Sequence, residues 1–533
     1  MSEIADLQKK TSSRLDNGCK NLPRLTTAQY FIEARCDHLL RQFGALALVL
    51  LFVHMLGCAS APASHSVLAT QAWALSTRSC IESSQELEEL AATRALYLSD
   101  PRPLSDLPFL ASNRFLAELP KPEWRLEQKD AWLDRLLAAG ERRQRLLHQL
   151  MGASVEAESE ELSERECLSE SDRISLLTDG WETLLRSAAI NDEYSSAKRI
   201  FGFYSLFRLP VQGGIADLHQ DRKASFANTA PDPRRTSNNG SKIISYTPPA
   251  LTRSSRPNTF SEPSYTRDAL GINGLSPADL KRLFEQHAPR WEVEHTGAYD
   301  VLGRPQRDAA SQTLLFDSTE QLSHVYPSLT WFAGAIRLQL NYIVWFESRP
   351  AANSLDLLAG KLDGLHWRVT LDDKGRALVY DSIHSCGCYH SFYTTSDIRT
   401  REAAKVLPEP PLVLPIDDSD QGGLTIRLKS RSHYVSGVYP ASTQSPLSDT
   451  SPRFYRLVPY ENLYFDEDGK PSGLFNRHGI IDGSERGERH YLWPMGIRSP
   501  GAMRERGRHA TAFVGRRHFD DGTLLDELFM LER

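Results

Sequence analysis

The stretch IRLQLNYIVWF, residues 336–346, decides the fold of the C-terminal part of this chain. Apolar and aromatic residues occupy every second position from Ile336 to Phe346, and Arg337, Gln339 and Asn341 lie between them. Side chains two residues apart point to the same face of a strand, so the alternation predicts a β-strand with one apolar face. We therefore expect a sheet to be built around residues 336–346.

A predicted β-hairpin follows this strand. Two alternating runs, 365–371 and 376–383, flank the turn-rich tetrapeptide Asp372-Asp373-Lys374-Gly375. A loop centred there sets Trp367 opposite Tyr380, and it sets His366 opposite Asp381 on the other face. A carboxylate bound to one imidazole nitrogen leaves the other nitrogen free as a base or a metal ligand. This register makes His366 and Asp381 candidate catalytic residues, and the alternative is an ordinary His and Asp pair on the sheet surface.

The densest chemistry of the chain comes next, in HSCGCYH, residues 384–390. Imidazole and thiolate are ligands suited to zinc, so His384, Cys386, Cys388 and His390 are candidate metal ligands. The spacing differs from the C-x₂-C pattern of common zinc sites. Three alternatives stay open: a disulfide between the two cysteines, a nucleophilic cysteine with a histidine base oriented by Asp381, and a purely structural loop.

Residues 470–518 are rich in arginine and histidine. Clustered guanidinium groups bind phosphates and carboxylates through paired hydrogen bonds, and solvated loop charge is the simpler explanation. The candidate anion-binding residues are Arg498, Arg508 and Arg516. If His509 or His518 folds back toward His366, the pattern favours an active site.

The N-terminal part, residues 59–210, is predicted to be a helical domain. From about residue 70 to residue 209 the apolar side chains recur with a helical period. Ser83 to Glu86 has the pattern of a capping box that opens a helix, and two further apolar stripes cover 133–151 and 174–188. Stripes of this kind are typical of helix cores and indicate no chemistry.

The two parts are separated by a predicted linker. Residues 211–263 are filled with Ser, Pro, Asn, Arg and Thr, a composition that buries too little apolar surface to offset the entropy of ordering. Beyond it, Ser276 and Pro277 are typical of a helix start. We therefore expect an α+β protein: a helical domain, a flexible linker, and a mostly antiparallel sheet domain with few helices over 264–533.

An apolar run, FGALALVLLFVHMLGC at residues 43–58, follows an atypical N-terminal extension over 1–42. The run is short for a transmembrane helix and has the length of a signal-peptide core. Its end, Met55-Leu56-Gly57-Cys58, resembles the lipobox of bacterial lipoproteins. The resemblance implies lipidation at Cys58, and Ala59 after the cysteine implies the outer membrane. The alternative is an uncleaved membrane anchor.

Composition agrees with export to an envelope. Four cysteines lie beyond the leader, and an oxidising compartment favours pairing Cys80 with Cys167. The formal charge of −6 over 533 residues argues neither for nor against nucleic acid, but export makes a nucleic-acid partner unexpected.

These features give two hypotheses of function. The segments QLNYIVWF, LHWRVTL and YDSIHSCGCYH are similar to an uncharacterised domain of envelope-associated bacterial proteins, which implies no activity. The chain has no GxSxG, HExxH or phosphate-binding glycine loop. The first hypothesis is a zinc-dependent hydrolase that acts on an anionic envelope substrate from the periplasmic face of the outer membrane. The second is a non-catalytic envelope lipoprotein that binds a cell-wall or protein partner, with a structural or redox disulfide between the two cysteines of the CGC loop.

Overall fold

The computed structural model describes residues 68, 73–152, 167–229, 242–248, 266–308, 311–417, 423–441, 453–466 and 468–532. The extension over 1–42, the run 43–58 and the lipidation expected at Cys58 lie outside these residues. Within the described part, none of the helices combines the length and the apolar character that crossing a bilayer requires.

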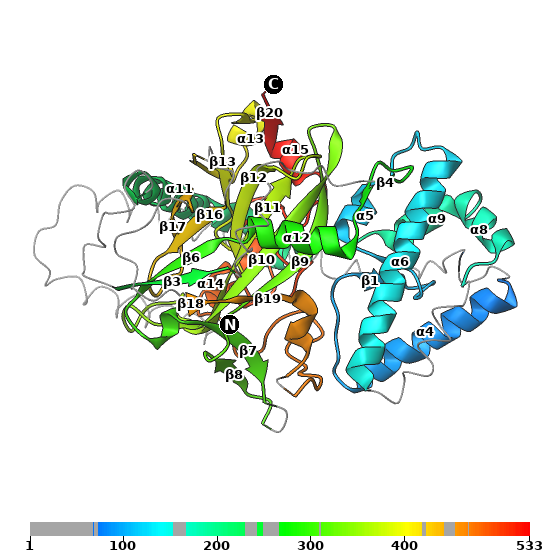
Figure 1. Ribbon diagram of the computed structural model, residues 1–533, viewed down its shortest axis with the longest axis horizontal. Coiled ribbons are helices and arrows are strands. Elements are labelled where there is room, and N and C mark those ends of the chain that lie inside the picture. Colours follow the sequence, from blue (N-terminus) through cyan, green and yellow to red (C-terminus); the bar gives the residue numbers. More distant parts are fainter. Residues whose placement is uncertain are drawn as a thin grey trace, which may run out of the picture. The chain divides into compact units, whose positions relative to one another are not determined.

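The predicted strand over 336–346 is confirmed and is longer than expected, because β10 spans Ala335–Arg349. It pairs antiparallel with β9 (Leu322–Phe332) and β11 (Gly360–Leu371), as Figure 1 shows. Tyr342 and Val344 on one face of β10 pack in the main hydrophobic core. Ile343 and Trp345 on the other face belong to another core cluster, so β10 is covered on both sides.

The large sheet around β10 has nine strands and is mixed. Its main path runs β15-β13-β12-β11-β10-β7-β8, and β9 and β19 attach beside β10. Two of its pairs, β13 with β15 and β19 with β9, are parallel, and the others are antiparallel. The additional strands are β7 (Leu302–Arg307), β8 (Leu314–Asp317), β12 (Ala377–His384), β13 (Ser391–Thr394), β15 (Leu412–Pro415) and β19 (Arg456–Pro459).

A second mixed sheet has five strands in the order β17-β16-β6-β3-β18. They are β3 (Lys242–Thr247), β6 (Arg290–His295), β16 (Leu424–Leu428), β17 (Val435–Pro440) and β18 (Arg453–Phe454). Three small two-stranded pieces complete the described strands: β1 (Arg102–Pro103) with β2 (Ala111–Ser112), β4 (Thr266–Arg267) with β5 (Asn273–Gly274), and β14 (Ile398–Thr400) with β20 (Phe529–Leu531). The chain therefore contains both helices and sheets, and both large sheets are mixed, with antiparallel pairs predominating in the nine-stranded one.

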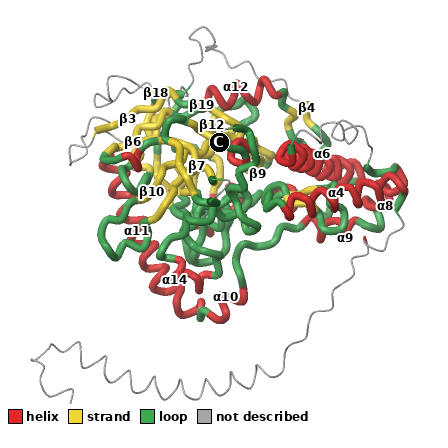
Figure 2. Tube along the Cα trace, turned by 90° about the horizontal axis from the view of Figure 1, so that it is seen from below, coloured by secondary structure: helices red, strands yellow, loops and turns green. Residues whose placement is uncertain are grey.

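Helices dominate the N-terminal part, as predicted (Figure 2). They are α4 (Leu75–Thr93), α5 (Arg114–Glu118), α6 (Leu126–Met151), α8 (Glu170–Leu177), α9 (Trp181–Ala188) and α10 (Ser196–Phe201). The stripe over 133–151 is confirmed, because Leu133, Leu136 and Leu147 of α6 are fully buried. The stripe over 174–188 belongs to two short helices rather than one.

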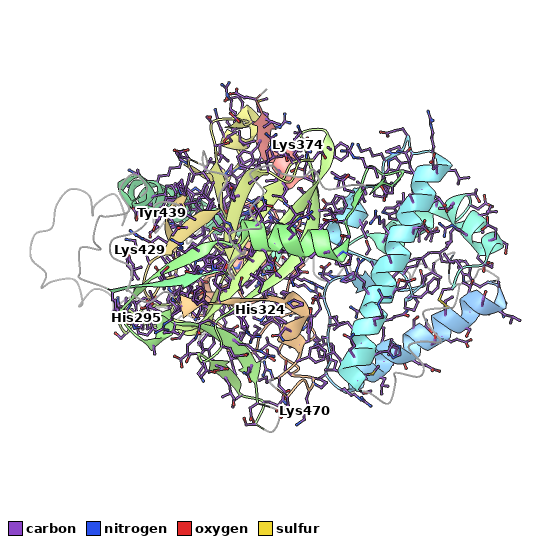
Figure 3. All side chains as sticks on the ribbon, in the orientation of Figure 1. His295, His324, Lys374, Lys429, Tyr439 and Lys470 are labelled. Carbon is purple, nitrogen blue, oxygen red and sulfur yellow. A yellow bond between two sulfur atoms is a disulfide. The ribbon has the colours of Figure 1, made fainter. Side chains whose placement is uncertain are left out.

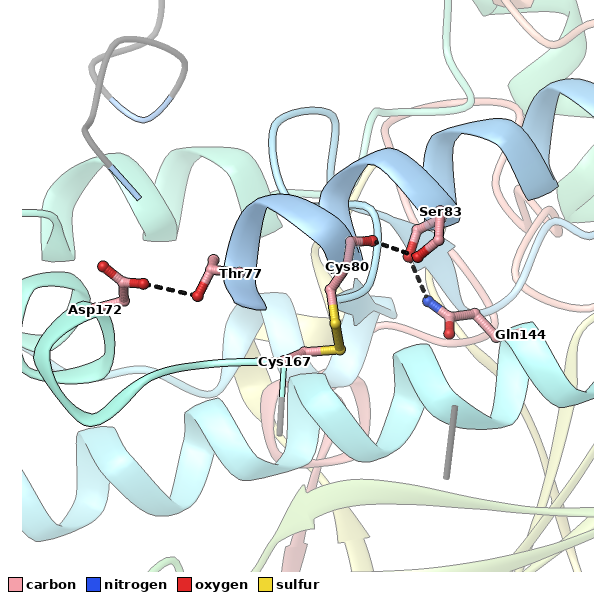
Figure 4. The surroundings of a disulfide bond; sticks show 7 residues. Thr77, Cys80, Ser83, Gln144, Cys167 and Asp172 are labelled. Carbon is pink, nitrogen blue, oxygen red and sulfur yellow. Dashed lines mark hydrogen bonds between the residues drawn. A yellow bond between two sulfur atoms is a disulfide. The ribbon is translucent and has the colours of Figure 1, made fainter. Parts of the chain in front are cut away.

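The capping box expected at Ser83 is wrong. The helix begins at Leu75, and Ser83 lies inside it, where its hydroxyl donates to the carbonyl of Cys80. The predicted disulfide is confirmed: Cys80 of α4 is bonded to Cys167, which lies just before α8 (Figure 4). It joins segments separated by 87 residues and thereby fixes α4 against the helices that follow.

The linker predicted over 211–263 is wrong in its described parts. Residues 204–229 form α11 (Tyr204–Thr229), and β3 lies in the second sheet. Phe226, Ile244 and Tyr246 are buried in the main core. Polar residues around these apolar side chains dominate the composition of the 53-residue window. The average composition of the window therefore did not reveal the helix and the strand. The domain boundary expected there also differs, because residues 66–533 form one compact unit.

The remaining helices are short. The start of α12 (Pro277–His287) is confirmed, with Ser276 Oγ accepting from the backbone N–H of Asp279. The others are α13 (Glu402–Lys405), α14 (Arg489–Leu492) and α15 (Leu524–Leu528), with 3₁₀ turns η3 (Ala298–Asp300), η4 (Tyr460–Tyr464) and η5 (Trp493–Met495).

The hairpin of β11 and β12 exists, but its predicted register is shifted by two residues. Trp367 lies opposite Ser382, and Val369 lies opposite Tyr380. The turn takes in one more residue than expected, because Asp372 N donates to Arg376 O, and a bulge after Thr370 absorbs another. Lys374 lies at the exposed tip of this turn (Figure 3). A shift of two keeps every side chain on its predicted face, and the rings of Trp367 and Tyr380 still stack, 5.6 Å apart.

Candidate functional site

The CGC loop is a tight turn between β12 and β13. The backbone N–H of Gly387 donates to His384 O at 2.7 Å, and that of His384 donates to Cys388 O at 3.0 Å. Gly387 has φ +89°, in the left-handed region that favours glycine, and a Cβ there would lie 2.6 Å from Ala510 O. This close approach explains why glycine separates the two cysteines.

Both cysteines are buried and free, and the Cys388 thiol lies within hydrogen-bonding reach of Cys386. The backbone N–H of Cys388 lies 3.3 Å from Cys386 Sγ. The hydrogen bond with Cys386, reinforced by burial, raises the pKa of the Cys388 thiol well above its usual value. A buried thiol of raised pKa is a poor nucleophile, because the thiolate is the reactive form. The raised pKa therefore argues against Cys388 as the attacking thiol.

Arg504 holds the loop in place from the other side. This side chain is buried, and its Nε donates to Cys386 O at 3.1 Å. Its guanidinium also donates to the carbonyls of Arg498 and Ser499, and its backbone N–H donates to Ser385 O. The CGC loop and residues 498–504 are thus fastened to each other by one cation.

A small pocket opens between these two segments. It is lined by Cys386, Gly387, Cys388, Ile497, Pro500, Gly501 and residues 510–513. The cysteine turn forms one wall, and the segment held by Arg504 contributes to the other. A change in the turn therefore changes the shape of the pocket.

The expected pairing of His366 with Asp381 is wrong. Arg368 lies opposite Asp381 and binds both of its carboxylate oxygens, at 2.9 and 2.7 Å. His390 Nε2 is 2.8 Å from Asp381 Oδ2. Burial alone would raise the pKa of Asp381, but the charge of Arg368 and the contact with His390 outweigh it and lower the pKa. Asp381 thus orients His390, and the residue that Asp381 pairs with across the hairpin is Arg368 and not His366.

His366 instead lies beside His509, which folds back from the arginine-rich segment as the active-site hypothesis requires. Their ring centroids are 4.8 Å apart, and His366 is buried. Neither ring nitrogen of His366 has a hydrogen-bond partner among the described residues. Burial, and next the neighbouring His509, lower the pKa of His366 well below its usual value. The pair is therefore neutral at pH 7 and buried.

A second buried network centres on Asp363, which the sequence analysis missed. Its carboxylate lies 3.3 Å from His384 Nδ1 and 2.8 Å from His433 Nδ1. His433 Nε2 lies 3.4 Å from Asp300 Oδ1, so a chain of alternating acids and imidazoles crosses the interior. Burial would lower the pKa of His433, but its contacts with Asp300 and Asp363 outweigh burial and raise it. An acidic residue inside an apolar strand is the only sequence signal for this network.

The four candidate metal ligands are therefore divided among three settings. His384 contacts Asp363, His390 contacts Asp381, and the two cysteines contact each other in the turn. Over the described ranges, no three His, Cys, Asp or Glu side chains are grouped so that they could hold a metal ion.

The three candidate anion-binding arginines lie on the neighbouring loops. Arg508 forms an ion pair with Glu193 at 2.8 Å, and Arg516 pairs with Asp192. Arg498 is exposed. Two of the three guanidinium groups are thus already bound to carboxylates of the chain itself.

No protein-family model, curated protein or solved structure matches this chain. The function is therefore argued from the site alone.

Proposed function

We propose that this protein is a membrane-tethered bacterial envelope protein that binds a cell-wall or protein partner on the surface around the small pocket beside the CGC loop. In this proposal Cys386 and Cys388 act as a dithiol–disulfide pair that sets the shape of the pocket. The observation that carries it is the contact between the two thiols in a turn that lines the pocket.

The oxidation step is a thiol–disulfide exchange. The two thiols lose two protons and two electrons to an external disulfide, which becomes a dithiol, and a bond forms between Cys386 Sγ and Cys388 Sγ. A disulfide closed over one intervening residue is strained, so it is more easily reduced than Cys80–Cys167. The export expected from residues 43–58 supplies the oxidising compartment in which this exchange occurs.

Arg504 supports a link between the redox state and the pocket. Closing the disulfide moves the two thiols together, and the Cys386 carbonyl that Arg504 binds belongs to the same turn. The same guanidinium is fixed to residues 498 and 499 on the opposite side. The two walls thus respond together to oxidation.

A zinc-dependent hydrolase is the second candidate. The neighbouring rings of His366 and His509 favour it, because His366 has two ring nitrogens with no partner among the described residues. In this alternative the cysteine pair and a histidine hold zinc, so the same variants decide between the two candidates.

The test uses a fragment of residues 66–533, purified without reductant, and counts free thiols under denaturing conditions. This fragment corresponds to the compact unit of the structure. We expect no free thiols in the parent and one in Cys386→Ser, and mild reductant should release two thiols in the parent before it opens Cys80–Cys167. Binding to purified peptidoglycan and to envelope protein extracts is compared before and after this mild reduction.

Metal analysis of the same samples separates the candidates. Two free thiols together with stoichiometric zinc, which is lost in Cys386→Ser, contradict the disulfide proposal and favour the hydrolase. The purified protein could instead have oxidised cysteines but bind its partner equally well before and after mild reduction. In that case the disulfide is a structural element, and its role in shaping the pocket is refuted.

A further inference from the structure

A cluster of apolar side chains is exposed where α10 meets α11. Ile200, Phe203 and Leu206 have exposed fractions of 74 %, 59 % and 62 %. Phe207 and Leu209 continue the exposed run along α11. Single exposed apolar residues are ordinary, but a continuous set of this kind marks an interaction surface.

Two aromatic residues from a distant part of the sequence extend this surface. Tyr491 of α14 is 66 % exposed, and Trp493 of η5 is 40 % exposed. Gly202 packs so closely on Pro494 that a Cβ at residue 202 would lie 2.6 Å from the proline Cβ. Figure 2 shows α10 and α14 next to each other. We call the seven residues Ile200, Phe203, Leu206, Phe207, Leu209, Tyr491 and Trp493 the apolar patch.

The framework of the apolar patch is fixed by specific contacts. Arg199 donates to Met495 O at 2.8 Å and to Gly515 O at 2.6 Å. Its guanidinium also stacks on the rings of Tyr194 and Tyr204. These contacts hold the helix ends beneath the exposed residues in place. The exposure of the apolar patch therefore does not come from a frayed helix end.

The charges beside the apolar patch are mainly positive. Arg498 is exposed, and Lys198 lies close enough to Arg498 for the two charges to repel. The nearby Asp192 is already paired with Arg516 and His518. Glu485 lies 3.9 Å from Arg489, so this acid too is partly neutralised.

We infer that the apolar patch docks on the surface of a phospholipid bilayer that contains anionic headgroups. Trp and Tyr concentrate at the membrane–water interface, and Phe, Leu and Ile bury their side chains at the boundary of the acyl chains. Basic residues at the rim meet anionic headgroups and strengthen binding. A bilayer satisfies both the aromatic and the basic parts of this surface. Docking through the apolar patch requires neither the expected anchor at residues 43–58 nor the cysteine pair.

The experiment is flotation of the 66–533 fragment with vesicles of phosphatidylethanolamine and phosphatidylglycerol, without the N-terminal run. The test variant is Ile200→Ser with Phe203→Asn and Leu206→Ser, three exposed sites whose change leaves the core intact. Asn is chosen for residue 203 because its φ is +50°, a region that Asn tolerates. We expect the parent to float and the variant to lose roughly hundredfold in partitioning, as the loss of three inserted apolar side chains implies.

The matched control changes two exposed apolar residues elsewhere, Leu355→Ser and Val406→Ser, at sites 84 % and 82 % exposed. It should float like the parent, and circular dichroism verifies that all three proteins are folded. Binding should weaken when phosphatidylglycerol is omitted or salt is raised. A parent that does not float, or a control that loses as much as the variant, overturns the inference. So does a parent that forms a dimer which the triple variant abolishes, since the apolar patch is then an interface between two copies.

Discussion

Replacing Asp381 by Asn tests whether the buried carboxylate is held by its arginine. Asp381 is fully buried, and Arg368 is 2 % exposed. The carboxylate accepts two hydrogen bonds from this guanidinium and contacts His390. Asn has nearly the same shape but no charge, and it offers one acceptor oxygen where Asp offers two. The change therefore removes the counter-charge with little change in volume.

The expected loss of unfolding free energy follows from the contacts that Arg368 keeps in the variant. Arg368 keeps its bond to Phe519 O at 2.7 Å and its stacking on the Phe519 ring, but it loses the carboxylate that binds it directly and is left with Asp520 as an acidic neighbour. Removing one partner of a buried ion pair costs about 3–5 kcal/mol, mostly because the other charge is stranded. A folded domain has about 5–15 kcal/mol of stability in total, so the effect is large.

The assay is urea unfolding of the 66–533 fragment at neutral pH, followed by far-UV circular dichroism. Glu402→Gln is the matched control, because Glu402 is an exposed carboxylate that pairs with Lys405 on the surface. We expect a lower midpoint for Asp381→Asn and an unchanged midpoint for the control. Adding Arg368→Met to Asp381→Asn should recover part of the loss, because no unpaired cation then remains. A loss below about 1 kcal/mol, or no recovery in the double variant, refutes the reasoning.

Two further predictions concern pH and the disulfide. Burial, and next Arg504, lower the pKa of His509 to about 3. As the pH falls, the unfolded chain therefore binds a proton at this histidine before the folded chain does, and the free energy of unfolding decreases below the ordinary histidine pKa of 6.5. His509→Asn should therefore reduce the loss of unfolding free energy between about pH 7 and about pH 5 by roughly 2 kcal/mol in paired urea titrations, and parallel pH profiles would contradict this. The double change of Cys80 and Cys167 to alanine should lower the unfolding free energy by about 2–5 kcal/mol, because the disulfide closes a long loop. Thermal unfolding checks this, and reductant strong enough to open the bond in the parent should reproduce the loss.

The helices and strands with strong periodicity could be predicted, because the pattern that specifies each of them lies within its own segment of the sequence. The strand β10 shows its alternation over eleven residues, and α6 shows three fully buried leucines at helical spacing. The helix α11 and the strand β3 could not be found in the same way. They contribute few residues to the main core, namely Phe226, Ile244 and Tyr246, and the neighbours that pack around these residues come from distant parts of the chain.

The sequence singled out the segment that forms the candidate site but not its contacts. The segment 384–390 contains a turn that lines a pocket, and His509 lies beside His366. The partner of Asp381 was missed because an extra turn residue and a bulge shifted the hairpin register, which no residue type announces. Asp300, Asp363 and His433 meet from three separate segments, so their network has no local pattern.

Arginine side chains in the arginine-rich end of the chain donate hydrogen bonds to backbone carbonyl groups. Residues 468–523 contain turns, short helices and isolated bridges but no described strand, so their carbonyl groups lack the partners that a sheet supplies. A guanidinium has five donors and no acceptor, which suits it to bind several carbonyls at once. Arg504 binds two of them, those of Arg498 and Ser499, and it also binds Cys386 O. Arg486 extends the same role to the facing strand β11, where it binds the carbonyls of Lys361 and Leu362. Buried carbonyls must find donors, and here arginine side chains provide them. Replacing such an arginine by lysine keeps the charge but not the fork of donors, so charge alone does not explain why these positions are arginine.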